Sequence, residues 1–567
     1  MSNNYEGLPL LATLGLVCGI ASGGVIILFR LAMDAGAKHW LPNGDIEDFE
    51  ALSSLERLAL CLLGGLAVGL ILQALKPKNR SVGVVHVIER LDYHQGYLPI
   101  KNALVQFIAA GISLLSGHSV GREGPSVHLG ATSGSALGRI LRVPNNGVRI
   151  LVGCGVAAAI AAAFNTPLAG VVFAMEVVIM EYSVIGFTPV ILAAVSSTTL
   201  TRVMLGDDSA FTVPLLDLST VYDIPMVAIM GALIGCLAAM FIKLTLLTSS
   251  VFANQSIWAR CVMAGLITGM IAVLVPQVMG TGYDTIDQML VVQLGLGAVL
   301  LLTLAKTLAT ASAIGLGIPA GLIGPTLFIG AGAGASFSAA VNGFSPDFAG
   351  LALYVVLGMA AMMAATLQAP LAALIYLLEL TASQDIILPG MTAVITASLV
   401  TRVVFGKSSI YRHLMLAQGL DYRNSPLSKA LRRIGVASVM ERNIVQQARY
   451  ISRQGAEEIL KQEPRWILLR DEDHRRESLL PATDLARHLN ELNHDDSQIK
   501  SDLDLLKIPA KRIDTAATTI VATLQEAYEK MQSEQCSVLF IRGAHGESKK
   551  RIYGVITREH IESSYRV

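Results

Sequence analysis

Long apolar stretches separated by short polar ones dominate the first 410 residues of the chain. The first runs from Leu8 to Phe29 with no Lys or Arg before it. It is long enough to span a bilayer and indicates a retained first helix rather than a cleaved signal. Further apolar segments lie at about 57–75, 101–117, 149–163, 167–180, 186–205, 224–247, 258–279, 293–315, 351–365, 368–381 and 388–405. This pattern predicts a polytopic helical membrane domain.

Several of these segments are shorter than the roughly 20 residues that cross the hydrocarbon core. Gly or Pro interrupts the apolar pattern at Gly124-Pro125, Pro167, Gly324-Pro325 and Pro370. Broken helices are tolerated inside a membrane only where the freed backbone faces protein or a polar cavity. The breaks therefore predict a pathway through the membrane rather than simple anchors.

The apolar part contains an internal repeat. Three blocks recur in the same order, 124–134 as 324–334, 155–176 as 358–379, and 201–206 as 401–406. Two homologous halves with broken helices at equivalent positions are typical of transporters and channels whose binding site lies between the repeats. Sequence alone leaves open whether the halves are inverted.

Charge divides the chain into the same two parts. Asp, Glu, Lys and Arg number 39 in residues 1–410 and 47 in residues 411–567, and they make up 15% of the whole. Soluble proteins carry about a quarter charged residues, so the first part is membrane-embedded and the last part soluble. This excludes a secreted enzyme, a disordered scaffold and a single globular domain. The net charge of zero excludes a general nucleic-acid binder.

The charged tail alternates short apolar runs with amphipathic stretches. The apolar runs at 466–469 and 537–540 read as strands, and residues 454–461 and 524–532 read as helices. Each half reads helix, strand, charged turn, strand, helix, which predicts a pair of soluble α/β modules.

Cysteine usage suggests no metal or redox chemistry. The six cysteines make no CxxC pair or metal-ligand spacing, and they read as small buried residues. The apolar part also shows no nucleophile–base cluster. We therefore expect no enzymatic activity, no metal site and no required cofactor.

The sharpest short motif is Gly-Arg-Glu-Gly-Pro at residues 121–125. Pro125 suits the first turn of a helix, where its missing N–H would have no partner. A helix start attracts anions, and Glu123 would place there a carboxylate that competes with a mobile anion. The alternative is that Arg122 and Glu123 only cap an interfacial loop. The matching Gly-Pro at 324–325 weakens that alternative.

This motif, the run Ala-Phe-Asn-Thr-Pro-Leu-Ala-Gly at 163–170 and Gly-Leu-Ile-Gly-Pro at 321–325 resemble the CLC family of chloride channels and proton-coupled chloride transporters. The resemblance covers about residues 8–420. It implies a homodimer with one anion pathway per subunit. Each subunit would have two inverted repeats of broken and tilted helices, whose starts converge on dehydrated anions.

By this resemblance Glu123 is the gating glutamate, which occupies an anion site when ionised and leaves it when protonated or displaced. Tyr411 resembles the family's pore tyrosine, whose hydroxyl donates to the central anion; otherwise it is an interfacial aromatic anchor. Ile323 replaces the usual phenylalanine of the third motif. The predicted anion-binding residues at the helix starts are Arg122, Gly124, Ile323 and Gly324.

The family's first motif is Gly-Ser-Gly-Ile-Pro, with the serine hydroxyl facing the anion. This chain has Ser81-Val82-Gly83-Val84-Val85 at the corresponding place. Aligned on Gly83, Val82 replaces the serine, which removes a hydrogen bond to the ion and should alter anion preference. Ser81 supplies a hydroxyl only if the loop shifts by one residue. We predict that residues 81–83 contribute to the anion site.

A second departure concerns proton coupling. In the family's exchangers two adjacent glutamates follow the Pro-Leu-Ala-Gly run, and the second passes protons. Here the positions are Glu176 and Val177, so the proton-relay position is lost. Glu176 and its repeat mate Glu379 read as helix-packing carboxylates. Passive conduction is therefore favoured over strict exchange, while water reaching Glu123 directly is an alternative proton route.

Residues 436–567 resemble a pair of CBS domains, a regulatory module often fused to this family. Thr557 matches the module's threonine, but His560 stands where an aspartate would hold a ribose. The first copy has Asp484 but Pro481 in place of the threonine. An adenine nucleotide is thus a candidate ligand at Asp484 and Thr557. We slightly favour the alternative interpretation, a dimerisation and coupling domain with an empty cleft.

The predicted architecture is an all-α CLC-like membrane domain over 1–422, with repeats at about 8–206 and 224–406. A soluble α/β CBS pair follows over 423–567, with modules at about 436–493 and 508–565. We expect a multi-pass protein of the plasma or inner membrane with a cytoplasmic tail.

The predicted function is channel-like, voltage-gated conduction of an anion, chloride above all, gated by Glu123. The alternatives are a proton-coupled exchanger with a non-standard proton path and a membrane-tethered nucleotide sensor with vestigial transport. The expected partners are a small anion, the lipid bilayer and a second copy of the chain, and no nucleic acid.

Overall fold

The structure, a computed structural model, describes residues 8–182, 184–207, 211, 213–214, 223–342, 350–420, 426–470, 477–492, 503–510, 513–544 and 551–564. The chain forms two compact units, which we call the helical unit (Met1–Leu141 and Val148–Tyr422) and the α/β unit (Arg142–Gly147 and Arg423–Val567). The predicted domain boundary at 422/423 and the predicted module ends at 493 and 565 lie outside the described residues.

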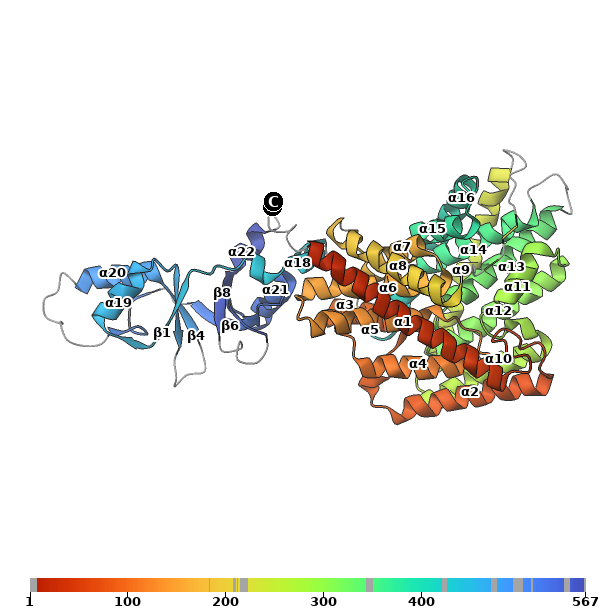
Figure 1. Cartoon of the computed structure of the whole chain (residues 1–567), viewed down its shortest axis with the longest axis horizontal. Coiled ribbons are helices and arrows are strands. Elements are labelled where there is room, and N and C mark those ends of the chain that lie inside the picture. The colour runs from red at the N-terminus through yellow and green to blue at the C-terminus, as the bar shows by residue number, and fades with distance from the viewer. Residues whose placement is uncertain are drawn as a thin grey trace. The chain divides into compact units, whose positions relative to one another are not determined.

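Helices make up the described core of the helical unit (Figure 1). They are α1 (Leu8–Trp40), α2 (Ser54–Ala74), α3 (Gly83–Tyr93), α4 (Ile100–Leu115), α5 (Glu123–Ile140), α6 (Asn145–Phe164), α7 (Pro167–Phe173), α8 (Val184–Leu205), α9 (Asp223–Val251), α10 (Ile257–Leu274), α11 (Tyr283–Val291), α12 (Leu296–Leu316), α13 (Ile323–Asn342), α14 (Leu351–Leu367), α15 (Pro370–Thr381), α16 (Ile387–Leu399) and α17 (Ile410–Ala417). Short 3-10 turns η2 (Pro77–Asn79) and η4 (Pro276–Val278) and π-helical turns η3 (Ala174–Ile179) and η5 (Val400–Val404) interrupt or extend them.

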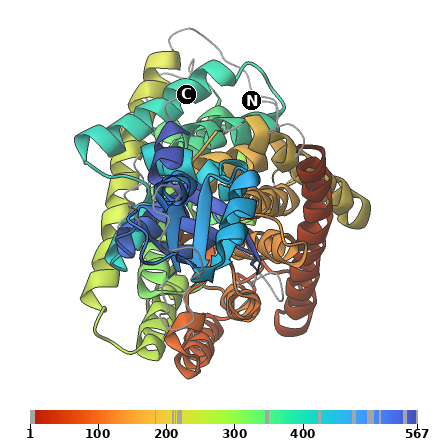
Figure 2. The same cartoon turned by 90° about the vertical axis from the view of Figure 1, so that its left-hand side faces the viewer.

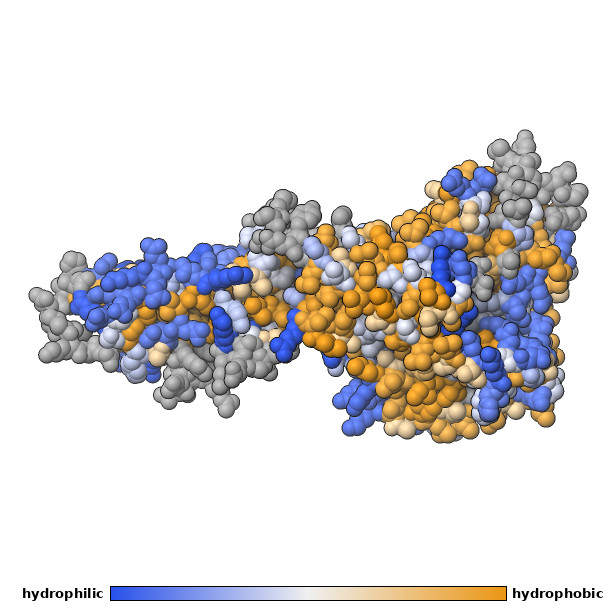
Figure 3. Space-filling view, viewed as in Figure 1, coloured by the Kyte–Doolittle hydropathy of each residue, from blue (hydrophilic) through white to orange (hydrophobic). Residues whose placement is uncertain are grey.

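Nine of the helices in the described ranges are long and apolar enough to cross a membrane. Helix α1, red in Figure 2, stands at the outer edge of the helical unit. The visible surface of this unit is mostly hydrophobic, while hydrophilic residues cover most of the α/β unit (Figure 3). An apolar surface of this extent belongs in lipid. The predicted polytopic helical membrane domain is confirmed.

Pairs of glycines hold the helix crossings of the two halves together. Gly130 of α5 faces Gly155 of α6, and Gly330 of α13 faces Gly358 of α14 in the same way. A Cβ atom on any of these glycines would collide with backbone of the partner helix. Small residues allow this close approach between membrane helices. The repeated glycines of the sequence therefore mark equivalent helix crossings.

The α/β unit contains one six-stranded sheet and one two-stranded sheet in its described residues. Its elements are α18 (Pro426–Arg433), η6 (Val436–Ser438), β1 (Ile444–Ala448), β2 (Tyr450–Ile451), α19 (Arg453–Lys461), β3 (Trp466–Arg470), β4 (Glu477–Pro481), α20 (Ala482–Leu492), β5 (Leu503–Asp504), β6 (Ile513–Thr519), α21 (Leu524–Ser533), β7 (Val538–Arg542), β8 (Ile552–Thr557) and α22 (Arg558–Ser563). The large sheet has the strand order β1-β3-β4-β6-β7-β8.

The large sheet is built from two similar halves. Strand β1 pairs parallel with β3, which pairs antiparallel with β4, and β6, β7 and β8 repeat this pattern. Strands β4 and β6 join the halves. Each half therefore begins with a strand, and the predicted order of helix, strand, turn, strand, helix is wrong at its start. Strands β1 and β6 are rich in Gln, Thr and Ala, so they lack the apolar run that marks β3 and β7.

One prediction on the cysteines needs correction. Cys18, Cys61, Cys154 and Cys261 are buried, but Cys236 on α9 is exposed and Cys536 is half-buried. Helix α9 is apolar on nearly all sides, so its hydrophobic pattern does not distinguish an inward position from an outward one.

Candidate functional site

The segments that precede α5 and α13 are paired directly with each other. Gly121 and Gly321 form an antiparallel bridge in which each N–H donates to the other carbonyl oxygen, both at 2.7 Å. A Cβ on Gly124 would lie 2.7 Å from the Cα of Gly321, so the backbones touch. The bridge brings the starts of two repeat-related helices together at one point. Its antiparallel geometry fits the inverted repeats that the resemblance implies.

Glu123 is fully buried at this meeting point. Its Oε1 accepts a hydrogen bond from the Tyr283 hydroxyl at 2.6 Å, while Oε2 has no partner among the described residues. The carboxylate packs against glycine backbone, because a Cβ on Gly321 or Gly324 would lie 2.8 or 2.9 Å from its oxygens. Two helix starts thus surround one carboxylate, where each favours negative charge by about 0.3–1 kcal/mol. A mobile anion would be favoured in the same place.

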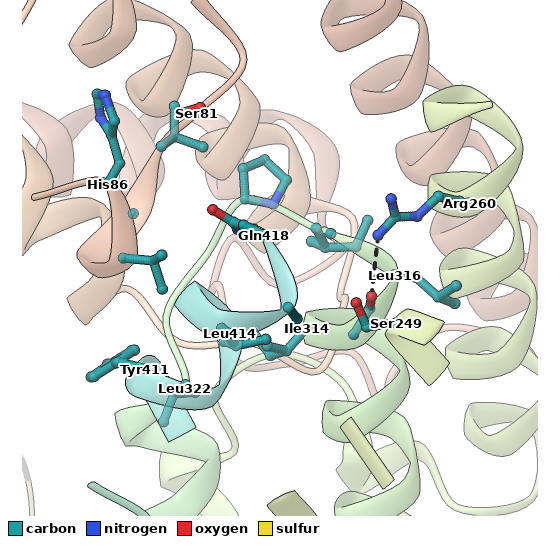
Figure 4. Close-up of a pocket in the computed structure, with 18 of the residues that line it drawn as sticks. Ser81, His86, Ser249, Arg260, Ile314, Leu316, Leu322, Tyr411, Leu414 and Gln418 are labelled. Carbon is teal, nitrogen blue, oxygen red and sulfur yellow. Dashed lines mark hydrogen bonds between the residues drawn. The ribbon is translucent and has the colours of Figure 1, made fainter. Parts of the chain in front are cut away.

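A cavity of about 1010 Å³ in the helical unit reaches this point from one side. Ser81, Val82 and Gly83 line it together with Gly321 and Tyr411. In Figure 4, Tyr411 and Leu322 lie at one side of the cavity and Arg260 at the other. The cavity therefore joins the first motif, the bridge residue Gly321 and the predicted pore tyrosine.

The cavity has an excess of positive charge. Its charged lining residues are Arg80, Lys243, Arg260 and Glu89. Arg260 donates to the carbonyl oxygen of Gly315 at 3.3 Å, which fixes the guanidinium at the wall. A cavity lined by one sign of charge raises the local concentration of the opposite ion. This cavity is suited to gather anions.

Tyr411 is the second residue of α17 and is only 4% exposed. An aromatic anchor at the membrane surface would present its ring to the interface. Tyr411 is instead buried and lines the cavity, and its role as a pore tyrosine stays a prediction.

The first motif lies at the start of α3 and lines the cavity. Val82 precedes α3 and makes no capping hydrogen bond, and Gly83 adopts a left-handed backbone with φ +81° that favours glycine. The Ser81 carbonyl oxygen accepts from the Asn102 amide at 2.9 Å. Both Ser81 and Val82 line the cavity, so a hydroxyl is present one residue before the predicted position.

The four anion-binding residues predicted at the helix starts do not line the large cavity. Arg122 lines a separate cavity of about 40 Å³ with Glu47 and Thr281, and its guanidinium lies 5.2 Å from the Tyr283 ring centre. Ile323 is buried at the start of α13. Gly124 and Gly324 lie against the bridge and Glu123, so the helix starts are assembled around the carboxylate rather than around the cavity.

Val177 is buried in η3, where the family's exchangers carry a glutamate. Its neighbour Glu176 accepts from the backbone N–H groups of Leu371 and Ala372 at the start of α15, at 3.3 and 2.7 Å. Glu379 of α15 accepts from Leu168 and Ala169 at the start of α7, at 2.9 and 2.8 Å. Both carboxylates therefore cap helices of the opposite half, which agrees with the packing role inferred from the sequence.

Sequence reasoning missed three groups beside this site. Tyr283 and the buried amide of Gln106, which donates to the Pro319 carbonyl at 2.9 Å, lie outside the repeated motifs. His86 and His128 form a buried pair with ring nitrogens 2.9 Å apart. His86 follows the first motif closely, so a histidine beside a predicted anion site was the signal available.

The two residues predicted for nucleotide binding lie in the α/β unit and take part in local contacts. Asp484 in the first turn of α20 pairs with Arg487 at 2.6 Å. The Thr557 hydroxyl caps α22 by accepting from the N–H of His560, whose ring nitrogen in turn accepts from the Thr557 N–H. His560 thus closes a capping box at the place of the expected aspartate.

Comparison with known proteins connects this geometry to a family. The family model described as voltage gated chloride channel matches residues 64–402. A ClcB-like protein of Ralstonia nicotianae is 33% identical over 413 residues, which is 71% of this chain and 95% of that protein. The H(+)/Cl(-) exchange transporter ClcA of Vibrio cholerae is 30% identical and covers 71% of this chain and 88% of its own. A eukaryotic CLC transporter structure, 18% identical, shares the fold with a TM-score of 0.61 and covers 99% of both chains.

Proposed function

The chain belongs to the voltage gated chloride channel (CLC) family, and on this premise we propose that it conducts chloride passively, with Glu123 as the gate. The observation that carries the proposal is the buried Glu123 carboxylate, held between the starts of α5 and α13 with one oxygen unpartnered among the described residues. An ionised Glu123 fills the anion position. A protonated or displaced Glu123 frees it for an ion from the positively charged cavity.

The residues at the position where the family's exchangers carry a proton-relay glutamate favour passive conduction over coupled exchange. Valine at 177 carries no proton, and the carboxylate of Glu176 is engaged by two backbone N–H groups. A channel needs only that the ion enters and leaves readily. Passive conduction therefore requires no proton-carrying side chain around the site.

Proton-coupled exchange is the second candidate, and one contact favours it. His86 lines the cavity and reaches His128, which lies on the same helix as Glu123. The two hydrogen-bonded rings offer nitrogen atoms between which a proton can pass, which a valine side chain does not, so this pair is a candidate replacement for the lost carboxylate relay. The relative named as an H(+)/Cl(-) exchange transporter is consistent with this candidate.

Reversal-potential measurements on the full chain in planar bilayers, with opposing chloride and pH gradients, separate the candidates. A reversal at the chloride Nernst potential supports the channel, and a pH-dependent offset that His128→Gln abolishes supports the exchanger. Absence of chloride current contradicts both and favours vestigial transport.

Glu123→Gln tests the gate in the same bilayers. We expect it to remove the pH dependence of the current, because glutamine mimics the protonated carboxyl. Glu56→Gln is the control, since Glu56 caps α2 through Ser53 and glutamine also forms a capping box. An unchanged pH profile in Glu123→Gln contradicts the gating role.

We extend the proposal to the whole chain by family resemblance. It acts as a homodimer in the plasma or inner membrane, without enzymatic activity, and the α/β unit is a cytoplasmic CBS pair. The repeated strand order in the two halves of the large sheet supports the CBS assignment. Asp484 and Thr557 already make local contacts, so an empty cleft is favoured over a bound adenine nucleotide.

A further inference from the structure

Tyr283 makes the one hydrogen bond that the structure gives to the Glu123 side chain. It is the first residue of α11, is 8% exposed, and donates its hydroxyl proton to Oε1 at 2.6 Å. A hydrogen bond from a hydroxyl to an ionised carboxylate is shorter than a hydrogen bond between neutral groups and roughly twice as strong. The contact therefore favours the ionised Glu123 in its buried position.

The Tyr283 ring is fixed from several sides. The Phe211 ring meets it edge to face with centres 5.0 Å apart, and the Arg122 guanidinium lies 5.2 Å from its centre. A Cβ on Gly324 would lie 3.1 Å from the Tyr283 hydroxyl oxygen, so the ring packs on the start of α13. A side chain held this way loses little further freedom when it bonds to Glu123.

Two charged side chains hold the turn that leads into α11. Lys306 is fully buried and donates to the carbonyl oxygens of Val278 and Gly280 at 3.0 and 2.9 Å. Glu47 accepts from the Gly282 N–H at 2.9 Å and from the Thr281 hydroxyl. A buried ammonium is costly inside a membrane domain, so its use here indicates that the position of the turn matters.

We propose that Tyr283 is a positioning residue of the gate, which holds ionised Glu123 between the two helix starts and lets it go on protonation. This inference rests on the proposed gating role of Glu123. A neutral carboxyl loses the charge-assisted bond, so proton binding weakens the contact at the moment the gate must open. The turn held by Lys306 and Glu47 keeps the phenol in place for the next closure.

Other charged and titratable groups also face Glu123, so a test of pH dependence needs a control variant among them. The charged and titratable neighbours are Arg122 beside it on the same helix start, Tyr283 from α11, Tyr376 from α15 and Tyr411 from α17. Arg122 in turn interacts with Glu47 and Asp34. Tyr376 is the matched control, because it is buried and its hydroxyl has no partner among the described residues.

The test is the pH profile of chloride current through the full chain carrying Tyr283→Phe. Without the hydroxyl the ionised carboxylate is less favoured, so the midpoint of activation should move to higher pH by about one unit, a tenfold change in proton concentration. Tyr376→Phe should leave the midpoint in place. Tyr283→Phe added to Glu123→Gln should produce no pH-dependent change, because no carboxyl remains to titrate.

The outcomes separate this inference from the proposed function. If Glu123→Gln abolishes the pH dependence but Tyr283→Phe leaves the midpoint unchanged, only the role of Tyr283 is wrong. If Glu123→Gln keeps the pH dependence, the gate itself is wrong. If Tyr283→Phe does not fold, Thr281→Val is the second variant. It removes one of the two hydrogen bonds that Glu47 accepts and so loosens the turn before α11. The midpoint of activation should then move to higher pH as well. An unchanged midpoint in Thr281→Val then overturns the proposal.

Discussion

Val82 occupies the cavity wall at the residue before α3, where a hydroxyl side chain would have two uses. Ser and Thr are favoured immediately before a helix, because their oxygen accepts a backbone N–H, and Val82 makes no such bond. A hydroxyl there would also add a hydrogen-bond donor to the cavity wall, which the neighbouring Ser81 likewise lines. The valine therefore gives up a donor at the one motif where the family usually supplies it.

Val82→Thr tests this residue with little change in volume. A hydrogen bond to a charged group contributes about 1.5–3 kcal/mol net, so a bond that chloride accepts and nitrate does not should raise the permeability of chloride relative to nitrate about tenfold or more. Bi-ionic reversal potentials measure the ratio. Val82→Ala is the control, because it removes bulk without adding a hydroxyl. Equal ratios in Val82→Thr and the unchanged chain would mean that this side chain does not face the ion.

At the scale of single residues, the candidate-site residues that could be predicted from the sequence are those that belong to repeated or spaced motifs. Glu123 was predicted because a carboxylate beside Gly-Pro in an apolar region has few structural explanations. Tyr283 and Gln106 were not, because each reaches the site from a distant helix and neither lies in a motif. Contacts such as Tyr283–Glu123, 160 residues apart, depend on how the helices pack.

Helices α7 and α15 are linked by a reciprocal exchange between the two halves. Each begins with Pro-Leu-Ala. Glu379 of α15 accepts the first N–H groups of α7, and Glu176 of η3, which directly follows α7, accepts those of α15. Helix starts of this kind attract anions, so Glu176 and Glu379 fill with protein groups two positions that ions would otherwise occupy. The arrangement leaves the starts of α5 and α13 as the pair that surrounds Glu123.

Glu176→Ala should destabilise the helical unit without changing ion coupling. Loss of the carboxylate leaves two backbone N–H groups at the α15 start without this acceptor, at a cost of about 1–3 kcal/mol for each that stays buried. Thermal unfolding of the detergent-solubilised chain measures the loss, and Glu379→Ala should match it. A shifted reversal potential in Glu176→Ala would instead assign this carboxylate to proton transfer.

Most long apolar helices could be predicted from their hydrophobic stretches, but α5, α13 and the short amphipathic helices were not among the predicted apolar segments. Helices α3, α11 and α17 are 11, 9 and 8 residues long, and each carries polar residues because it lies at the site. Their starts supply Gly83, Tyr283 and the approach to Tyr411. The elements most concerned with function were thus the ones with the weakest hydrophobic signal.

Over the whole molecule, the sequence separated the chain into an apolar and a charged part near residue 410, and the two compact units follow that division closely. The acidic residues of the two units have different roles. Glu123 lies in the helical unit between helix starts, whereas Glu526 lies in the α/β unit as part of the capping box of α21 with Thr523. Charged residues are rare in the helical unit, where Glu123 lies at the candidate site, and common in the α/β unit.

Glu526 provides a pH dependence that belongs to the α/β unit alone. Burial raises the pKa of its carboxyl above the ordinary value, despite the hydrogen bonds that it accepts. A carboxyl with a raised pKa in the folded state stabilises the fold at low pH, and this contribution is lost as pH rises through the folded pKa. Glu526→Gln keeps a capping box and removes the ionisation, so α21 should be better protected than in the unchanged chain at about pH 8 and equally protected at about pH 4.

Hydrogen exchange of peptides from α21 in the detergent-solubilised full chain, corrected for the intrinsic pH dependence of exchange, measures this protection. Glu123→Gln is the control, since it should remove the pH dependence of the current while leaving the exchange profile of α21 unchanged. Protection of α21 that falls in Glu526→Gln at high pH would show that the ionised carboxylate stabilises the unit. In that case the hydrogen bonds from Asn145 and Thr523, rather than the cost of burial, would dominate the energetics of Glu526.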